Sequence, residues 1–207
     1  VGTALLLAIV VGSGFMGDSL GSGNAAVALL GNSTATGAGL YVLITLLGPI
    51  SGAHFNPVVS LMFWKLGELD LNKMMGYWAC QFTGAITGIW LTHLMFNLPI
   101  IQESSNVRTG VGIWVSEFIS TLILLLVIRI SVKEAKDRVP MLVALTVTAG
   151  YWFTSSTFFA NPAVALARSF TNTFVGIAPN NVLGFILAEI LASLILILVI
   201  NKSSSES

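Results

Sequence analysis

Six long apolar runs alternate with short polar segments along the chain, at about 1–17, 33–50, 74–97, 111–132, 139–156 and 181–201. An α-helix needs roughly 20 mostly apolar residues to cross the hydrocarbon core of a bilayer. Each run is of that order, although two are somewhat short. The pattern therefore predicts an all-α membrane protein with six transmembrane helices.

Two Asn-Pro turns interrupt this pattern. They lie in "SGAHFNPVVSLMFWKLG" at 51–67 and in "FANPAVALARSF" at 159–170. Asn is a good helix N-cap, and Pro is favoured at the first helical position. The residues after each turn allow only about two or three helical turns, too few to cross a bilayer. We therefore expect two re-entrant half-helices, which begin at Asn56-Pro57-Val58 and Asn161-Pro162-Ala163.

The two halves of the chain resemble each other. "GTALLLAIVVGSG" at 2–14 is similar to "STLILLLVIRISV" at 120–132, and an Asn-Pro turn follows each. We expect one membrane channel domain over 1–207, made of a first repeat (1–110), a second repeat (111–201) and a polar tail (202–207). Three spans per repeat is an odd number, so the repeats must be inverted. Inverted repeats place the solute site at the midplane.

The half-helix N-termini would meet near that midplane. Each contributes roughly half a positive charge, and the Asn side chains add amide donors. Such a site orients water or a small polyol by its oxygens and repels cations, including protons.

Composition supports a membrane location. Hydrophobic residues make up 55% of the chain, charged residues 9%, and the mean hydropathy is +0.90, whereas soluble domains carry about 25% charged residues. The net charge of zero argues against a nucleic-acid surface. With the single cysteine Cys80, no intrachain disulfide is possible, and we expect no metal and no cofactor. The sequence has no H-E-x-x-H, no G-x-S-x-G and no paired catalytic carboxylates, so we do not expect an enzyme.

The position of the basic residues predicts the orientation. With six spans, both termini and the segments after the second and fourth spans share one side. That side holds seven basic residues (Lys65, Lys73, Arg129, Lys133, Lys136, Arg138 and Lys202), and the other side holds two (Arg108 and Arg168). The termini should be cytoplasmic, in a multi-pass protein of the cell inner (plasma) membrane. The chain opens at Val1 inside an apolar run, which we interpret as a trimmed N-terminus and not a signal peptide.

"SGAHFNPVVS" and "NPAV" resemble the paired signature segments of the aquaporin, or major intrinsic protein, family. Glu117 in "SEFIST" is similar to the Glu that opens the family's fourth span. The resemblance implies the aquaporin fold, a homotetramer in the lipid bilayer with one pore per protomer, and water and small neutral solutes as the permeants. Val58 departs from the family's usual Ala.

The resemblance also implies a four-residue selectivity filter on the extracellular side of the Asn pair. Counting from Asn56 and Asn161 without gaps assigns it to Thr36, Ala149, Phe158 and Val164. Most of the family carries Arg at the place of Val164, and water-selective members carry Phe and His at the first two places. The expected filter is therefore wide and uncharged.

A wide filter should pass polyols, urea-like solutes and metalloid hydroxides such as arsenite. The Arg-to-Val change also resembles a bacterial aquaglyceroporin branch found with arsenic-resistance genes, which is associated with trivalent and methylated arsenicals. We therefore predict a passive channel for small uncharged solutes. The alternative is a proton-coupled transporter that uses a buried Glu, either Glu117 or Glu189.

Several single residues keep more than one interpretation. Arg168 lies one helical turn after Val164, in the outer vestibule. It is either a displaced filter residue or a basic funnel at the outer mouth or, as we favour, it binds loop carbonyls or lipid headgroups. His54 either gates the inner pore by protonation or, as we favour, braces its loop through a backbone carbonyl. Glu117 is expected to accept backbone N–H groups of a re-entrant loop, with a proton relay as the alternative.

Overall fold

The computed structural model describes residues 1–205 and is helical throughout its regular elements; Glu206 and Ser207, the end of the predicted tail, lie outside the described residues. The described part contains the following helices: α1 (Gly2–Leu20), α2 (Ala25–Ser51), α3 (Pro57–Lys65), α4 (Leu71–Met95), α5 (Val111–Glu134), η1 (Lys136–Arg138), α6 (Val139–Phe153), α7 (Pro162–Ala167), η2 (Arg168–Phe170) and α8 (Pro179–Ser205).

Of the eight α-helices in the described residues, six are long and two, α3 and α7, are short, as the apolar runs and Asn-Pro turns predict. Within the described residues, α1, α2, α5 and α8 are long and apolar enough to cross a membrane. α6 has only 15 residues, and α4 carries polar side chains such as Gln81, Thr83 and Thr87.

The second predicted span begins earlier than expected, at Ala25 instead of 33. Asn24 is the reason, because its side chain caps the helix by accepting hydrogen bonds from the N–H groups of Ala26 and Val27. At the other end of the chain, α8 stays helical to Ser205. The helix therefore extends past the apolar run and into the polar segment that begins at Lys202.

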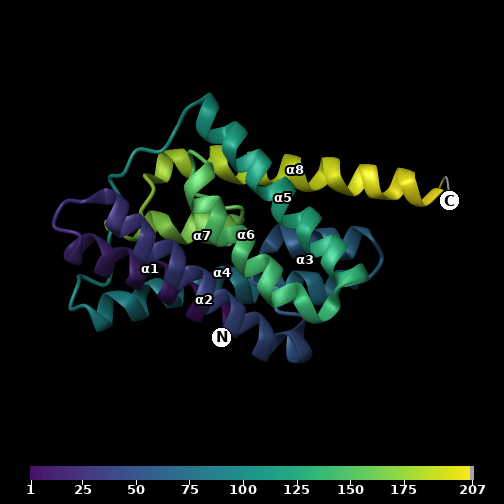
Figure 1. The fold of residues 1–207 in the computed structure, drawn as a ribbon, viewed down its shortest axis with the longest axis horizontal. Helices are drawn as coiled ribbons and strands as arrows, with labels where there is room; N and C mark the ends of the chain where they lie inside the picture. The colour runs from purple at the N-terminus through teal and green to yellow at the C-terminus, as the bar shows by residue number, and fades with distance from the viewer. Residues whose placement is uncertain (206–207) are drawn as a thin grey trace.

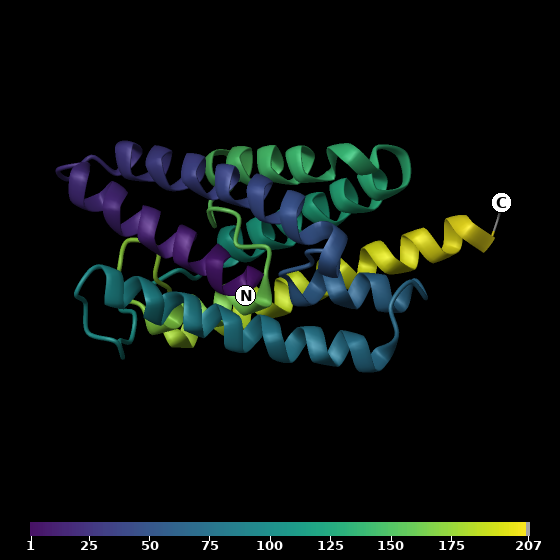
Figure 2. The ribbon, with the colours of Figure 1, turned by 90° about the horizontal axis from the view of Figure 1, so that it is seen from below.

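The long helices form a bundle whose axes run mostly along the longest dimension of the molecule (Figures 1 and 2). α1 packs on α2 and α4, α2 packs on α6, and α5 packs on α6 and α8. A side chain at Gly88 would place its Cβ 2.2 Å from the carbonyl oxygen of Ala4, so the α1–α4 contact depends on that glycine.

The two short helices lie inside this bundle. Both α3 and α7 contact α4 and α8, and they contact each other. The order of elements is the same in both halves: two long helices, a short one and a third long one. The half-helix of each repeat therefore packs on long helices from both repeats, which brings residues about 100 positions apart into one site.

Candidate functional site

Each short helix begins at the Asn of an Asn-Pro turn. The Asn56 side-chain oxygen accepts a hydrogen bond from the N–H of Val58 at 3.1 Å. The Asn161 oxygen accepts from Ala163 at 3.0 Å and from Val164 at 3.3 Å. A helix start leaves N–H groups without intrahelical partners, so each Asn satisfies part of its own helix end and is held in a fixed orientation.

The same two side chains also join the re-entrant loops. Asn56 Nδ2 donates to the carbonyl oxygen of Ala160 at 2.7 Å, and Asn161 Nδ2 donates to that of Phe55 at 3.0 Å. Both acceptor residues have left-handed backbone, with φ of 47° at Ala160 and 50° at Phe55. Non-glycine residues adopt this conformation at a cost of about 1–3 kcal/mol where surrounding structure holds them. Each Asn amide therefore keeps one N–H group that these two bonds do not use.

Two acidic side chains accept hydrogen bonds from the backbone of the second re-entrant loop. Glu117 on α5 accepts the N–H of Phe159 at 2.9 Å and that of Ala160 at 2.8 Å. Glu189 on α8 accepts the N–H of Asn161 at 2.9 Å. Both carboxyl groups are fully buried. Three consecutive backbone amides therefore have carboxylate acceptors, and the Glu117 carboxylate acts as the buried acceptor of this loop.

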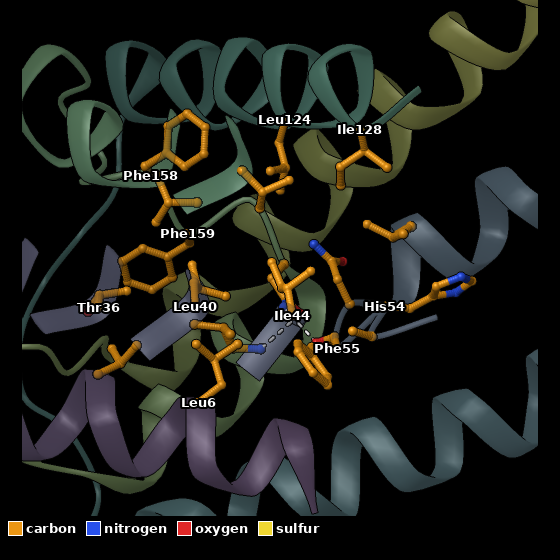
Figure 3. Close-up of a pocket in the computed structure, with 18 of the residues that line it drawn as sticks. Leu6, Thr36, Leu40, Ile44, His54, Phe55, Leu124, Ile128, Phe158 and Phe159 are labelled. Atoms are coloured by element: carbon orange, nitrogen blue, oxygen red, sulfur yellow. Dashed lines mark hydrogen bonds between the residues drawn. The ribbon is translucent and has the colours of Figure 1, made fainter. Parts of the chain in front are cut away.

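A cavity of about 120 Å³ passes between the two Asn-Pro loops. Since one water needs roughly 10–15 Å³ of such space, the cavity has room for on the order of ten. Figure 3 shows Thr36, Phe158 and Phe159 toward one end and His54 toward the other. Its wall is mostly aliphatic and aromatic, and the polar groups in it come from Thr36, His54, Asn56, Tyr151, Asn161 and Arg168.

Comparison with known proteins decides the family. A model of the family described as "Major intrinsic protein" matches residues 1–188. The chain belongs to the major intrinsic protein family.

Relatives and a solved structure agree with the family assignment. Aquaglyceroporin AqpS of Rhizobium meliloti (strain 1021) is 52% identical over 193 residues, which are 93% of this chain and 82% of that protein. Aquaporin-8 of Mus musculus is 32% identical over 124 residues, 55% of this chain and 46% of its own. The aquaglyceroporin structure from Plasmodium falciparum superposes with a TM-score of 0.69 at 22% identity and covers 100% of this chain and 96% of that one, which shows the fold.

The protein therefore has the aquaporin fold and is an integral multi-pass membrane protein. The major intrinsic proteins are transport channels and not enzymes, so the cavity is a candidate pore and its lining residues are candidate selectivity groups.

Three of the four residues assigned to the family's filter line the cavity: Thr36, Phe158 and Val164. Ala149 does not line it. Its side chain is exposed on the outer face of α6, and the cavity is lined instead by Tyr151, whose hydroxyl lies 3.3 Å from Thr36 Oγ1.

Helix geometry explains why Ala149 does not line the cavity. The residues of α6 that face the cavity are Val139, Val143, Val147 and Tyr151, which are four apart and share one face of the helix. A residue two positions after Val147 points to roughly the opposite face. The count from Asn161 assumed the usual spacing, and here the inward position lies ten residues before Asn161.

Arg168 makes a loop-carbonyl contact of the kind that we favoured, and it also belongs to the cavity wall. An open outer vestibule would leave it accessible, whereas its side chain is only 2% exposed and lines the cavity. Its Nε donates to the carbonyl oxygen of Val175, and its guanidinium carbon lies 3.5 Å from the centre of the Phe159 ring. A loop-carbonyl contact was one of the interpretations, and it is present together with a place in the cavity wall.

Sequence reasoning did not single out Arg108. From the loop after α4, its Nε donates to the carbonyl oxygen of Gly176 at 2.9 Å, and its Nη2 donates to that of Phe174 at 3.2 Å. Burial lowers the pKa of its guanidinium. The carbonyls that bind the two Arg side chains are consecutive, so Arg108 and Arg168 fix one loop. No motif marks Arg108; only its place in a polar loop distinguishes it.

His54 lies near the inner end of the cavity. Its Nδ1 is 3.1 Å from Ser60 Oγ, so its partner is a side chain and not the expected backbone carbonyl. Its ring stacks on Phe63 at 4.8 Å and meets the edge of Tyr77 at 5.3 Å. Burial, with a smaller effect of Lys73, lowers the pKa of His54 to about 4. The ring is therefore neutral near pH 7.

Proposed function

We propose that this protein is a passive channel for water and for small uncharged solutes such as glycerol and metalloid hydroxides, arsenite among them. One observation carries the proposal: Asn56 and Asn161 cap two half-helices, bind each other's loops and line a single cavity between them. Amide donors and two positive helix ends at that point favour solute oxygens over cations. The 52% identity to aquaglyceroporin AqpS supports glycerol-like permeants.

The width of the filter is a separate part of the proposal. Val164 is smaller than the Arg that most of the family carries at its place, and Thr36 is smaller than the Phe of water-selective members. Both differences favour solutes larger than water. Tyr151 takes the place assigned to Ala149 and brings a phenol ring into the wall. The pore would therefore be narrower than the sequence count implies. We infer permeation by glycerol and arsenite, with methylated arsenicals as the largest candidates.

A proton-coupled transporter is the competing function. It would need a carboxylate that reaches the pore. Both oxygens of Glu117 accept backbone N–H groups, one oxygen of Glu189 does so, and neither residue belongs to the cavity wall. These contacts favour a structural role for both carboxylates.

Stopped-flow light scattering on proteoliposomes tests the channel. Water, glycerol and arsenite are applied in turn, with protein-free liposomes as the control. Through a channel, the solute flux rises linearly with a moderate concentration gradient. The liposomes never accumulate solute against that gradient. Saturation at low millimolar solute, or uptake against a gradient driven by a pH difference, would favour the transporter instead.

We also propose a homotetramer with cytoplasmic termini in the cell inner membrane. The basic residues support that orientation, because seven of the nine would lie on the cytoplasmic side. Arg129 of α5 and Glu68, which follows α3, form an ion pair of 2.6 Å at that end. Mass measurement in detergent tests the tetramer, and labelling of a cysteine introduced near Lys136 from either side of sealed vesicles tests the orientation.

A further inference from the structure

We propose that Arg168 supplies the fixed charge and the hydrogen-bond donors that Val164 does not, acting on the filter from one turn further along the half-helix. The inference rests on the proposed channel function. It makes Arg168 a specificity residue that repels cations and binds an oxygen of the permeating solute.

The direction of the Arg168 side chain is the first argument. α7 continues into η2 at this residue without a break in the right-handed backbone. The Cα–Cβ bonds of a helix tilt toward its N-terminus, so a long side chain leans over the residue four positions earlier. That residue is Val164, whose short side chain leaves space for it. Arg168 therefore leans toward the level of the filter.

The contact with Phe159 fixes that level. The guanidinium carbon is 3.5 Å from the ring centre of Phe159, and Phe159 directly follows the filter residue Phe158 in the chain. The positive group therefore lies beside the second re-entrant loop and not out in the solvent. Stacking on an aromatic face is a favourable place for a guanidinium.

The donors of Arg168 are only partly used. A guanidinium has five N–H groups, and within the described residues only the Nε group has a hydrogen-bond acceptor, the carbonyl oxygen of Val175. Since Arg168 lines the cavity, its four terminal N–H groups are the donors available to a solute there. Polyols and metalloid hydroxides carry the hydroxyl oxygens that such donors bind.

The charge of Arg168 also lacks a neutralising ion pair. The ion pair of the described residues joins Arg129 and Glu68 at the other end of the protein. A positive charge beside a cavity with a mostly apolar wall repels cations strongly, because the surrounding protein screens the charge less than bulk water would.

Ion leak in proteoliposomes, measured with a pH-sensitive dye and with potassium gradients, tests the proposal. Arg168→Gln removes the charge and keeps an amide, and Arg168→Lys keeps the charge without the planar fork. We expect the Gln variant to leak protons and potassium roughly tenfold or more above wild type, from the lost repulsion. The Lys variant should stay near wild type. An Arg168→Gln leak equal to wild type would overturn the proposal.

Two further variants separate charge from loop stability. Arg108→Gln loses bonds to the same 174–176 loop, but Arg108 does not belong to the cavity wall, so its leak should stay well below that of Arg168→Gln. Equal leaks would assign the effect to a loosened loop and refute the cavity role. The double variant Val164→Arg/Arg168→Gln returns an Arg to the family's usual place, and we expect it to restore cation exclusion.

Glycerol flux through the wild type keeps the two proposals apart. If the wild type passes no glycerol above protein-free liposomes, the proposed function fails. If it passes glycerol and Arg168→Gln leaves ion leak unchanged, only the role of Arg168 fails. Should Arg168→Gln not fold, the wild type alone still decides: its residual ion leak should favour chloride over potassium, and a potassium preference would contradict a fixed positive charge in the pore.

Discussion

Replacing Glu117 with Gln is the most informative perturbation of the second re-entrant loop. The carboxylate accepts two backbone amides, from Phe159 at 2.9 Å and from Ala160 at 2.8 Å. A Gln side chain keeps one acceptor oxygen and turns an NH₂ group toward the other amide. That amide then faces a donor in a site where Glu117 is fully buried, so no water replaces the lost bond.

The expected cost follows from the contacts. A hydrogen bond to a charged group contributes about 1.5–3 kcal/mol, and an unsatisfied buried amide costs about 1–3 kcal/mol. We expect Glu117→Gln to destabilise the protein by roughly 3 kcal/mol. For a chain of this size that corresponds to about 6–12 °C in the unfolding midpoint.

Glu189→Gln is the matched control. Only Oε1 of Glu189 accepts a backbone amide, from Asn161. Oε2 accepts no N–H group, and the carboxyl group interacts directly with that of Glu117. Gln can keep the acceptor and place its NH₂ where Oε2 was. We expect a shift of no more than about a third of that at Glu117, by the same bond energies.

Thermal unfolding in detergent, followed by tryptophan fluorescence, measures both variants, and glycerol flux in liposomes reports the loop. Glu117→Gln should lower the midpoint and the flux together. If Glu189→Gln proved as destabilising as Glu117→Gln, the count of satisfied amides would not explain the stability of this loop, and the reasoning would fail.

Three further predictions concern the cavity wall. Tyr151→Ala should raise the glycerol flux several-fold relative to the water flux, whereas Ala149→Leu should change neither flux. The reverse result would support the assignment of Ala149 to the filter. Asn161→Asp should abolish folding or flux, because a carboxylate would face the Phe55 carbonyl at a cost of several kcal/mol; normal expression with unchanged fluxes would refute it. Because the pKa of His54 is about 4, flux should not change between pH 7.5 and 5.5. Since that pKa lies below the ordinary 6.5, folded-state stability should fall only as the pH drops from 6.5 toward 4, an effect that His54→Gln should remove.

The sequence was sufficient to predict the half-helices, because their starts depend on local chemistry. Asn caps a helix and Pro favours its first position wherever they occur, and both Asn-Pro turns form such starts. The buried role of Glu117 was also open to prediction, since an ionisable group on a span needs a partner. That partner could not be identified, because it lies about 40 residues away.

The register between α6 and α7 could not be predicted from the sequence. It depends on the loop between them, where Thr157, Phe158 and Ala160 all have positive φ. Residues with left-handed backbone reverse the chain within a few positions. Where such residues are not glycine, the sequence gives little indication of that conformation. A count along the chain therefore assigned Ala149 to a face that the loop geometry gives to Tyr151.

In the proposed pore, Val164 and Arg168 would control two different properties: Val164 the width of the filter and Arg168 its charge. An Arg at 164 would extend from the first turn of the half-helix across the pore, and the same group would both narrow the pore and charge it. From position 168 the guanidinium instead lies against the Phe159 ring, with its Nε bound to the Val175 carbonyl, so it follows the wall. A wider solute would then pass Val164 while still meeting a positive charge and free donors. If this is how selectivity arises, solute size and ion exclusion should respond to different substitutions: Val164 variants should change the glycerol-to-water ratio, and Arg168 variants the ion leak.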